Sequence, residues 1–314
     1  MRLLFVADPL EHFKTYKDTT FAMMRAAAAR GHQLLACEPK DLVWRSDGRV
    51  VAPMREFTLT GEQPQWFAEQ GAPTRALAEV DAVVMRKDPP FDSEYFYATH
   101  LLQQAEREGA RVFNKPAALR DHPEKLAILE FPALIAPTLV TRDAAAIRAF
   151  HAEQRDIILK PLDGMGGMGI FRVGPDGLNL GSIIETLNKD GAQTVMVQRY
   201  LTEIVRGDKR ILLIGGEPVP HALARIPQGS EIRGNMAVGG KGVAQPLSAR
   251  DRELAAALGP VLAARGLLLV GLDVIGDSVT EINVTSPTGF QEIAGQTGFD
   301  VAGMFVAALE RALA

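Results

Sequence analysis

KPLDGMGGMGIFRV, the stretch from Lys160 to Val173, decides the fold of this chain because a lysine at the end of an apolar strand precedes a glycine-rich loop. Glycines lack a Cβ, so successive backbone N–H groups can approach anionic oxygens closely. The lysine adds a compact positive charge that neutralises those oxygens. The arrangement is typical of a site that holds polyphosphate.

The residues after the loop decide which kind of phosphate site it is. Gly164, Gly166 and Gly169 match the G-x-G-x-x-G dinucleotide fingerprint, which requires the loop to open a helix. Here a β-forming run from Ile170 to Val173 follows instead. A Walker A loop is excluded as well. In a Walker A loop the lysine follows the glycines and leads into a helix, whereas here Lys160 precedes the glycines. A glycine loop between two strands forms a lid over the phosphates of ATP, although this stretch alone leaves a plain surface hairpin open.

Composition narrows the classes of protein. The 314 residues predict two or three units. A formal net charge of -4 argues against an extended surface for nucleic acid. The single cysteine, Cys37, excludes an intrachain disulfide and a Cys-based zinc cluster, and its apolar surroundings predict a buried side chain. The first residues reach Asp8 and Pro9 too early for a signal peptide, and no long uncharged apolar run follows. We therefore expect a cytoplasmic protein that binds neither membrane nor nucleic acid.

The first unit, residues 1–122, alternates strands with helices. Strands are predicted at residues 3–7, 32–37, 80–85 and 111–114, and helices at 18–30 and from 92 or 93 to 108. Such alternation indicates a parallel sheet with helices on both faces. Residues 40–75 show no clear period, and we expect loops and a small hairpin there.

Two further units follow. In residues 123–203 we expect a helix that starts at Pro123, an amphipathic helix over 143–155, and strands over 157–160 and 195–198. In residues 204–314 we expect a hairpin of strands 210–214 and 219–225, followed by a helix that opens with the capping box Ser248-x-x-Asp251.

The strand from Glu281 to Thr285 carries a candidate metal site. Its alternation puts Glu281 and Asn283 on one face, and two such oxygens suit a hard cation such as magnesium. Asp273, on the neighbouring strand, joins them only if the strands pair correctly. A three-residue turn, 276–278, sets Asp273 opposite Glu281, whereas a two-residue turn turns it to the other face. A solvated hairpin face with scattered acids is the alternative.

Several motifs stand along the chain: Arg86-Lys-Asp-Pro-Pro-Phe-Asp92, Asn114-Lys-Pro116, Lys125, the glycine loop, Gly207-Asp-Lys-Arg210, Arg225, Arg233 and Glu281-Ile-Asn-Val-Thr-Ser-Pro287. Together these motifs resemble the bacterial glutathione synthetase family of the ATP-grasp superfamily, and the resemblance covers essentially the whole chain. The matching departs at Gly289-Phe290, where a cysteine or another residue is expected.

The resemblance implies an α/β protein with the ATP-grasp fold. Residues 1–122 would form an N-terminal parallel-sheet (pre-ATP-grasp) domain that contributes to substrate binding, 123–203 the central lid subdomain and 204–314 the C-terminal catalytic subdomain. The implied activity joins γ-glutamylcysteine to glycine, giving glutathione, ADP and phosphate through an acyl phosphate. ATP and Mg²⁺, with Mn²⁺ as an alternative metal, are the implied cofactors, and a homo-tetramer is the implied assembly.

The resemblance also implies roles for individual residues. Lys125 and Lys160 would contact the ATP phosphates. Arg210 and Arg225 would stabilise charge during the reaction. The other implied positions are Gly164, Gly166 and Gly167 of the glycine loop, Gln198, Tyr200 and Leu201 along the adenine, Asp208 near the nucleotide, Arg86 and Arg233 on substrate carboxylates, Asn283 and Ser286 on the dipeptide, and Asp273, Glu281 and Asn283 on the metal.

One more segment, residues 226–241, is rich in glycine and has no helical or strand period. It is predicted to be a lid that keeps water from the acyl phosphate, with Arg233 in its middle, although a surface loop is the alternative. Two other functions stay open. One is an ATP-grasp carboxylate-amine ligase with a different acceptor, and the other is a non-catalytic nucleotide-binding protein. A protein kinase is excluded, because the sequence has neither a His-Arg-Asp nor an Asp-Phe-Gly motif.

Overall fold

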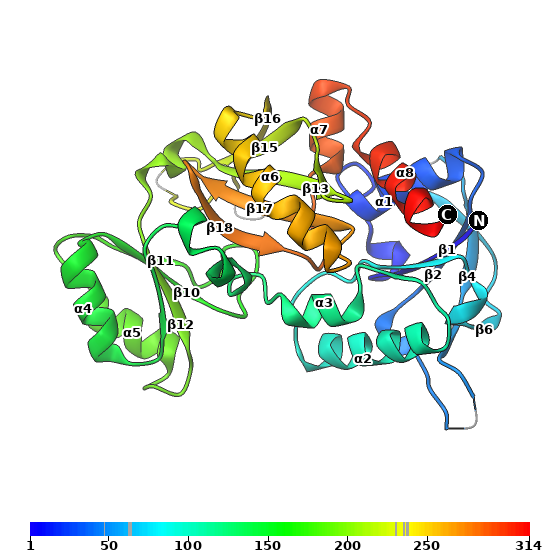
Figure 1. Ribbon diagram of the computed structural model, residues 1–314, viewed down its shortest axis with the longest axis horizontal. Helices are drawn as coiled ribbons and strands as arrows, with labels where there is room; N and C mark the ends of the chain where they lie inside the picture. Colours follow the sequence, from blue (N-terminus) through cyan, green and yellow to red (C-terminus); the bar gives the residue numbers. More distant parts are fainter. Residues whose placement is uncertain (47, 62–64, 230, 235, 237–238) are drawn as a thin grey trace.

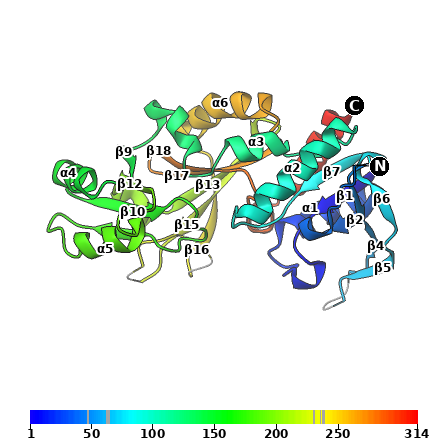
Figure 2. The ribbon, with the colours of Figure 1, turned by 90° about the horizontal axis from the view of Figure 1, so that it is seen from below.

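The structure is a computed structural model that describes residues 1–314 except 47, 62–64, 230, 235 and 237–238. The described residues form three sheet-containing units. The N-terminal sheet lies at one end of the molecule, a small middle unit lies at the other, and the C-terminal sheet lies between them (Figure 1). Figure 2 shows the same order from a second direction.

The N-terminal sheet has six strands in the order β5-β4-β2-β1-β7-β8. Its four strands β2, β1, β7 and β8 are parallel, as predicted, whereas β4 and β5 add an antiparallel hairpin at one edge. This hairpin lies within residues 40–75, as expected, and its aromatic residue Phe57 packs against Trp66. The strands are β1 (Arg2–Val6), β2 (Gln33–Cys37), β4 (Arg55–Leu59), β5 (Phe67–Gly71), β7 (Ala82–Met85) and β8 (Val112–Phe113), beside a separate pair of β3 (Val51–Pro53) and β6 (Thr74–Ala76).

Helices cover both faces of this sheet because buried side chains alternate along β1. Leu4 belongs to one apolar cluster with Leu102 of α2 (Ser93–Arg107). Leu3 belongs to another with Met23 of α1 (Thr19–Ala29). Both helices begin as predicted: the Asp18 side chain accepts from Phe21 N at 2.7 Å, and the Asp92 side chain accepts from Tyr95 N at 2.9 Å.

The predicted helix at Pro123 is wrong. The helix of this region is α3 (Pro116–Asp121), and a short 3₁₀ turn, η4 (Ala127–Glu130), stands where the prediction placed a helix. Pro116 occupies the first helical turn of α3, which suits its missing N–H, and Pro132 disfavours helical geometry at the residue before it. The other 3₁₀ turns are η1 (Leu10–His12), η2 (Pro39–Asp41), η3 (Leu77–Glu79), η5 (Pro132–Leu134) and η6 (Thr202–Arg206).

The middle unit is a four-stranded antiparallel sheet in the order β11-β10-β12-β9. The glycine loop joins β10 to β11, which confirms a loop between two strands. Two helices pack on the sheet through an apolar cluster that includes Ile147, Leu159 and Ile184. The elements are β9 (Thr138–Thr141), α4 (Ala144–Gln154), β10 (Ile157–Pro161), β11 (Phe171–Val173), α5 (Leu180–Asn188) and β12 (Val195–Arg199).

The C-terminal sheet has six strands, five of them in the order β16-β15-β13-β17-β18, with β14 paired to β13. Helix α6 begins with the predicted capping box of Ser248 and Asp251. Strand β18 ends at Asn283, short of the predicted Thr285. The elements are β13 (Asp208–Ile214), β14 (Glu217–Pro218), β15 (His221–Ile226), β16 (Lys241–Pro246), α6 (Ala249–Ala264), β17 (Leu269–Ile275), β18 (Ser278–Asn283), α7 (Phe290–Thr297) and α8 (Val301–Leu313).

The last helix returns to the first unit. Phe305 of α8 shares an apolar cluster with Met23 of α1. The side chain of Glu310 accepts from Arg30 Nε at 3.0 Å and lies 2.8 Å from His32 Nε2. The two ends of the chain therefore lie close together in Figure 1. Among the described residues, no helix is long and apolar enough to cross a membrane.

Candidate active site

A cavity of about 610 Å³ lies where the three units meet. Its lining includes Thr20 from the first unit, Lys160 from the middle unit and Glu281 from the third. Every residue that the sequence singled out for catalysis, nucleotide binding, substrate binding or metal binding lines it: Arg86, Lys125, Lys160, Gly164, Gly166, Gly167, Gln198, Tyr200, Leu201, Asp208, Arg210, Arg225, Arg233, Asp273, Glu281, Asn283 and Ser286.

The pairing of β17 with β18 determines which acidic residues lie opposite each other. Asp273 lies opposite Glu281, as the metal-site hypothesis requires, but without the three-residue turn on which that pairing was expected to depend. Ile275 pairs with Ser278, so the turn has two residues, and a β-bulge near Thr280 then shifts the register by one. The extra residue restores Asp273 to the face of Glu281 and increases the local twist.

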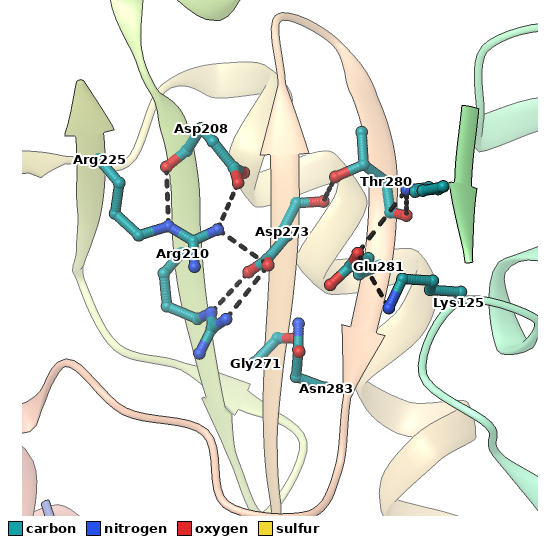
Figure 3. Close-up of polar contacts among 10 residues, drawn as sticks. Lys125, Asp208, Arg210, Arg225, Gly271, Asp273, Thr280, Glu281 and Asn283 are labelled. Carbon is teal, nitrogen blue, oxygen red and sulfur yellow. Dashed lines mark hydrogen bonds and ion pairs between the residues drawn. The ribbon is translucent and has the colours of Figure 1, made fainter. Parts of the chain in front are cut away.

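Two arginines hold Asp273 from one side (Figure 3). Arg210 donates Nε to Oδ1 at 2.5 Å and Nη2 to Oδ2 at 3.1 Å, and Arg225 Nη2 lies 2.8 Å from Oδ2. Burial alone raises the pKa of Asp273, but the two guanidinium groups outweigh it, so the pKa lies below its ordinary value. Asp273 is therefore a carboxylate held in place by positive charge.

Asp208 completes this network. Its Oδ2 lies 2.5 Å from Arg225 Nη2, while its buried Oδ1 has no hydrogen-bond partner among the described residues. Burial raises the pKa of Asp208, Arg225 opposes that rise and the charge of Asp273 adds to it. A bound group that donates a proton or a positive charge would satisfy Oδ1.

Two buried lysines flank Glu281. Its Oε1 lies 3.8 Å from Lys125 Nζ (Figure 3). It lies 3.7 Å from Lys160 Nζ, and both distances are too long for a hydrogen bond. Lys160 also donates to the backbone oxygen of Thr280 at 3.3 Å, and Lys125 donates to that of Gly164. Burial lowers the pKa of Lys160, although Glu281 opposes the shift. Two such loosely paired cations in a cavity form a ready site for anionic oxygens.

The oxygens on this face fit a magnesium-like cation in part. Glu281 and Asn283 offer oxygens, since Asn283 uses its Nδ2 to donate to Gly271 O at 3.2 Å. Asp273 differs, because both of its carboxylate oxygens are engaged by arginines. No group of three or more His, Cys, Asp or Glu side chains is placed to hold a metal in the described part of the chain. A cation here would rest on few protein oxygens and take its other ligands from phosphates and water, as magnesium does.

The glycine loop needs its glycines. A Cβ on Gly164 would lie 2.8 Å from Pro161 Cγ and 3.0 Å from Met168 O. Gly167 has a φ of +85°, in the left-handed region. The segment 226–241 reaches this loop, because Arg233 Nη1 donates to Gly167 O at 3.0 Å. The lid hypothesis for that segment falls partly outside the described residues, which omit 230, 235, 237 and 238.

The residues expected along the adenine lie at the end of β12. Gln198 is buried and its Nε2 donates to Thr138 Oγ1 at 3.0 Å. The centroid of the Tyr200 ring lies 3.7 Å from the guanidinium carbon of Arg172. Leu201 lines the cavity with Ile158, which gives this part an apolar wall that suits a flat base.

Arg86 connects the first unit to the third. Only 4% of this arginine is exposed, and its Nε donates to Thr20 Oγ1 at 3.0 Å while its Nη2 donates to Pro287 O at 3.3 Å. Its Nη1 has no hydrogen-bond partner among the described residues. Nearby, Ser286 donates its hydroxyl to Asp88. The Arg86 guanidinium therefore has capacity left for an anionic group.

Glu124 is a residue that the sequence interpretation missed. Its Oε1 accepts from Val284 N at 2.9 Å, Thr285 N at 3.1 Å and Thr285 Oγ1 at 2.8 Å. These bonds explain why β18 ends at Asn283, because the next two backbone donors turn to a side chain instead of a strand. The sequence gives no signal for this role other than the adjacent Lys125.

Known protein families and relatives match this chain over nearly its whole length. The model of the prokaryotic glutathione synthetase N-terminal domain matches residues 1–120, and that of the prokaryotic glutathione synthetase ATP-grasp domain matches residues 124–298. A glutathione synthetase from Ralstonia nicotianae is 62% identical over 99% of this chain and 96% of the relative. One from Neisseria meningitidis serogroup A is 58% identical over 98% of each chain.

Solved structures support the fold. The chain resembles the D-cycloserine synthetase DcsG with a TM-score of 0.69 and 17% identity, covering 100% of both chains. It resembles the ATP-grasp ligase PsnB, complexed with a minimal precursor, with a TM-score of 0.63 and 21% identity over 99% of each chain. At these identities the likeness concerns the fold alone.

Proposed function

Because this chain belongs to the prokaryotic glutathione synthetase family, we propose that the residues around Glu281 carry out the ligation for which the family is named. The protein is an ATP-dependent ligase that joins γ-glutamylcysteine to glycine and makes glutathione. It uses ATP, a divalent metal ion and small-molecule substrates.

Lys125 and Lys160 are the reason for assigning one end of the cavity to the nucleotide. Both are buried cations that face Glu281 without a close ion pair, which favours binding of phosphate oxygens between them. Gly164, Gly166 and Gly167 would close over those phosphates with their backbone N–H groups, while Gln198, Tyr200 and Leu201 would lie along the base. Asp208 would lie near the nucleotide, where its Oδ1 lacks a protein partner.

We propose magnesium as the metal, with manganese as a substitute, held by Glu281 and Asn283. Asp273 would become a metal ligand only by releasing one of its two arginines. While those ion pairs persist, Asp273 supports the metal site only indirectly. When bound, the cation neutralises charge on the phosphates and aligns them for transfer. The protein's own part is to fix the two oxygens on one face of β18.

The chemistry explains why an arginine pair stands beside this site. A carboxylate is a poor electrophile, so its oxygen first takes the γ-phosphoryl group of ATP, and ADP leaves. The glycine amine then attacks the carbonyl carbon, loses a proton, and phosphate leaves. Negative charge develops in both steps, and Arg210 and Arg225, which both pair with Asp273, would stabilise it.

The dipeptide would bind toward the first unit. Arg86 has an unused donor, Nη1, for a substrate carboxylate, and Ser286 and Asn283 line the same cavity. Arg233, from the segment 226–241, would bind a second carboxylate as that segment closes. Its bond to Gly167 supports a joint closure of the two loops, which would keep water from the acyl phosphate.

We propose further that residues 1–122, 123–203 and 204–314 act as substrate-contributing, lid and catalytic parts of a cytoplasmic homo-tetramer that binds neither membrane nor nucleic acid. Light scattering on the purified protein measures the assembly directly. A monomeric mass at enzymatic concentrations would contradict the tetramer without affecting the assigned chemistry.

Phosphate release from ATP tests the assigned reaction. With γ-glutamylcysteine and glycine both present, we expect one phosphate for each glutathione formed, and little release when either substrate is omitted. Equal release with another amine in place of glycine would favour a ligase with a different acceptor. No release with any amine would favour a non-catalytic nucleotide-binding protein.

A further inference from the structure

Glu292 is a charged residue of the cavity that the reaction above does not use. It lies in the first turn of α7 and lines the cavity. Its Oε2 is buried and has no hydrogen-bond partner among the described residues. Burying a carboxylate oxygen without a partner is costly, and here burial raises the pKa of Glu292. A bound cation or proton donor would remove that cost.

The start of α7 is fixed against the first unit. The Thr19 side chain accepts from the backbone of Gly289 at 3.3 Å and of Phe290 at 3.4 Å. The side chain of Gln291 donates to Thr15 O at 2.7 Å. Glu292 is therefore held beside the first unit, toward which the dipeptide is proposed to bind.

The charges around Glu292 support that location. Lys17, from the segment before α1, acts on Glu292 through its charge, whereas Lys125 and Lys160 face Glu281 at the phosphate end. Lys17 is exposed and lines the cavity as well. A carboxylate and an ammonium that line one end of the cavity suit a ligand that itself carries both charges.

The reactants offer few partners for a buried carboxylate. ATP is anionic, and the metal ion is expected near Glu281. The glycine amine must be unprotonated when it attacks, and an ion pair with a carboxylate would keep it protonated. The remaining cation is the α-ammonium group of the γ-glutamyl residue, at the opposite end of the dipeptide from the carboxyl group that reacts.

We propose that Glu292 binds the α-ammonium group of γ-glutamylcysteine, so that this residue selects a donor with a free α-amino group. The proposal rests on the proposed function of the cavity. It makes Glu292 a specificity-determining residue with no part in phosphoryl transfer. The γ-linkage leaves the α-amino group free, and Glu292 would be the residue that detects it.

Glutaryl-cysteine, which is γ-glutamylcysteine without its amino group, tests the proposal. In the unmodified protein we expect kcat/KM for glutaryl-cysteine to be roughly ten- to a hundredfold below that for γ-glutamylcysteine, which corresponds to one charged hydrogen bond. In Glu292→Gln, kcat/KM for γ-glutamylcysteine should fall by a similar factor, while that for glutaryl-cysteine should stay unchanged or rise. The preference for the amino group should therefore disappear.

Glu185→Gln is the matched control, because Glu185 is an exposed residue of α5 that does not line the cavity. It should keep the full preference. Equal losses with both donors in Glu292→Gln would overturn the proposal and assign Glu292 to the packing of α7. A change confined to the KM of glycine, or to the pH dependence of its attack, would overturn it in favour of a role toward the acceptor.

The unmodified protein decides the matter even if the variant fails to fold. Equal use of the two donors by the unmodified protein would contradict any recognition of the α-ammonium group. Failure of the proposed function looks different, because no phosphate would then be released with γ-glutamylcysteine and glycine at all. The two failures can therefore be distinguished in the same assay.

Discussion

At the scale of single residues, the site combines one loosely paired carboxylate with one tightly paired carboxylate. Glu281 lies 3.7 to 3.8 Å from two lysine ammonium groups, whereas Asp273 is bound closely by two arginines. Two acids opposite each other on paired strands thus have different environments. The loosely paired one is free to take a new partner, and the tightly paired one orients the arginines.

The first prediction concerns Glu281. Glu281→Gln should lower kcat by roughly thirty- to a thousandfold, since one electrostatic contributor of this kind is worth about 2 to 4 kcal/mol. The isosteric amide should leave the fold intact. Steady-state kinetics at saturating magnesium, with the melting temperature as the control for folding, measures both, and near-normal turnover would remove Glu281 from the metal site.

The second prediction separates the dipeptide from the nucleotide. Lysine cannot reproduce the fork of donors that Arg86 offers, so Arg86→Lys should weaken apparent affinity for γ-glutamylcysteine by about ten- to a hundredfold. Affinity for ATP should hardly change. Separate titrations of the two ligands check this, and equal weakening of both would show that Arg86 supports the interface between the units.

At the scale of elements, the residues after β18 depend on Glu124. Replacing it by alanine removes the acceptor for three donors of Val284 and Thr285. We expect Glu124→Ala to lower kcat/KM for the dipeptide by about ten- to a hundredfold, because Ser286 and Asn283 lose their fixed positions. Glu124→Gln keeps a carbonyl acceptor and should restore most of the activity.

Kinetics of these two Glu124 variants with each substrate separate positioning from folding. A loss that is equal in the alanine and glutamine variants would mean that the charge of Glu124, rather than its hydrogen bonds, matters. A loss that tracks the melting temperature alone would assign the residue to stability.

The fourth prediction concerns the segment 226–241. Shortening its centre should raise the ratio of phosphate released to glutathione formed above one, because water then reaches the acyl phosphate. Arg233→Met provides a milder test, since it removes the bond to Gly167 while leaving the segment in place. A ratio that stays at one in both variants would show that the segment does not protect the intermediate.

The elements also show which parts of the fold can be predicted from the sequence alone. Periodicity and caps predicted α1, α2, α4 and α6 well, because Asp18, Asp92, Asp143 and Ser248 are strong local signals. Strand β9 was not predicted. Its four residues are half-buried, so no clear alternation marks them.

The site was predictable as a set of residues but not as a geometry. The pairing of Asp273 with Glu281 depends on a bulge at Thr280, and bulges leave no reliable mark in a single sequence. The arginine pair around Asp273 and the role of Glu124 depend on contacts between residues far apart in the chain. Such contacts follow from the tertiary fold and from no local pattern.

At the scale of the whole molecule, a charge cluster joins α8 to the first unit. Arg30 and His32 both contact Glu310, and the hydrogen bond from Arg30 chiefly lowers its pKa to about 2. A carboxyl group with a lowered pKa stabilises the folded state at pH values above its unfolded pKa of about 4.5, and this stability is lost as the pH falls toward 2.

The fifth prediction follows from the lowered pKa of Glu310. Between about pH 4.5 and 2, the melting temperature of the unmodified protein should fall toward that of Glu310→Gln, while near neutral pH the unmodified protein should melt higher. Thermal unfolding of both proteins across this range is the measurement. Parallel curves with a constant offset would show that Glu310 contributes through packing instead of charge.

The return of α8 to α1 has a consequence for synthesis. Arg30 and Glu310 are 280 positions apart, yet they lie together, and Phe305 covers the apolar side of α1. A chain leaving the ribosome therefore cannot finish its first unit until nearly all of its residues have been translated. Until then α1 would expose an apolar surface. Nascent chains halted before Val301 should therefore bind chaperones, whereas the complete chain should not.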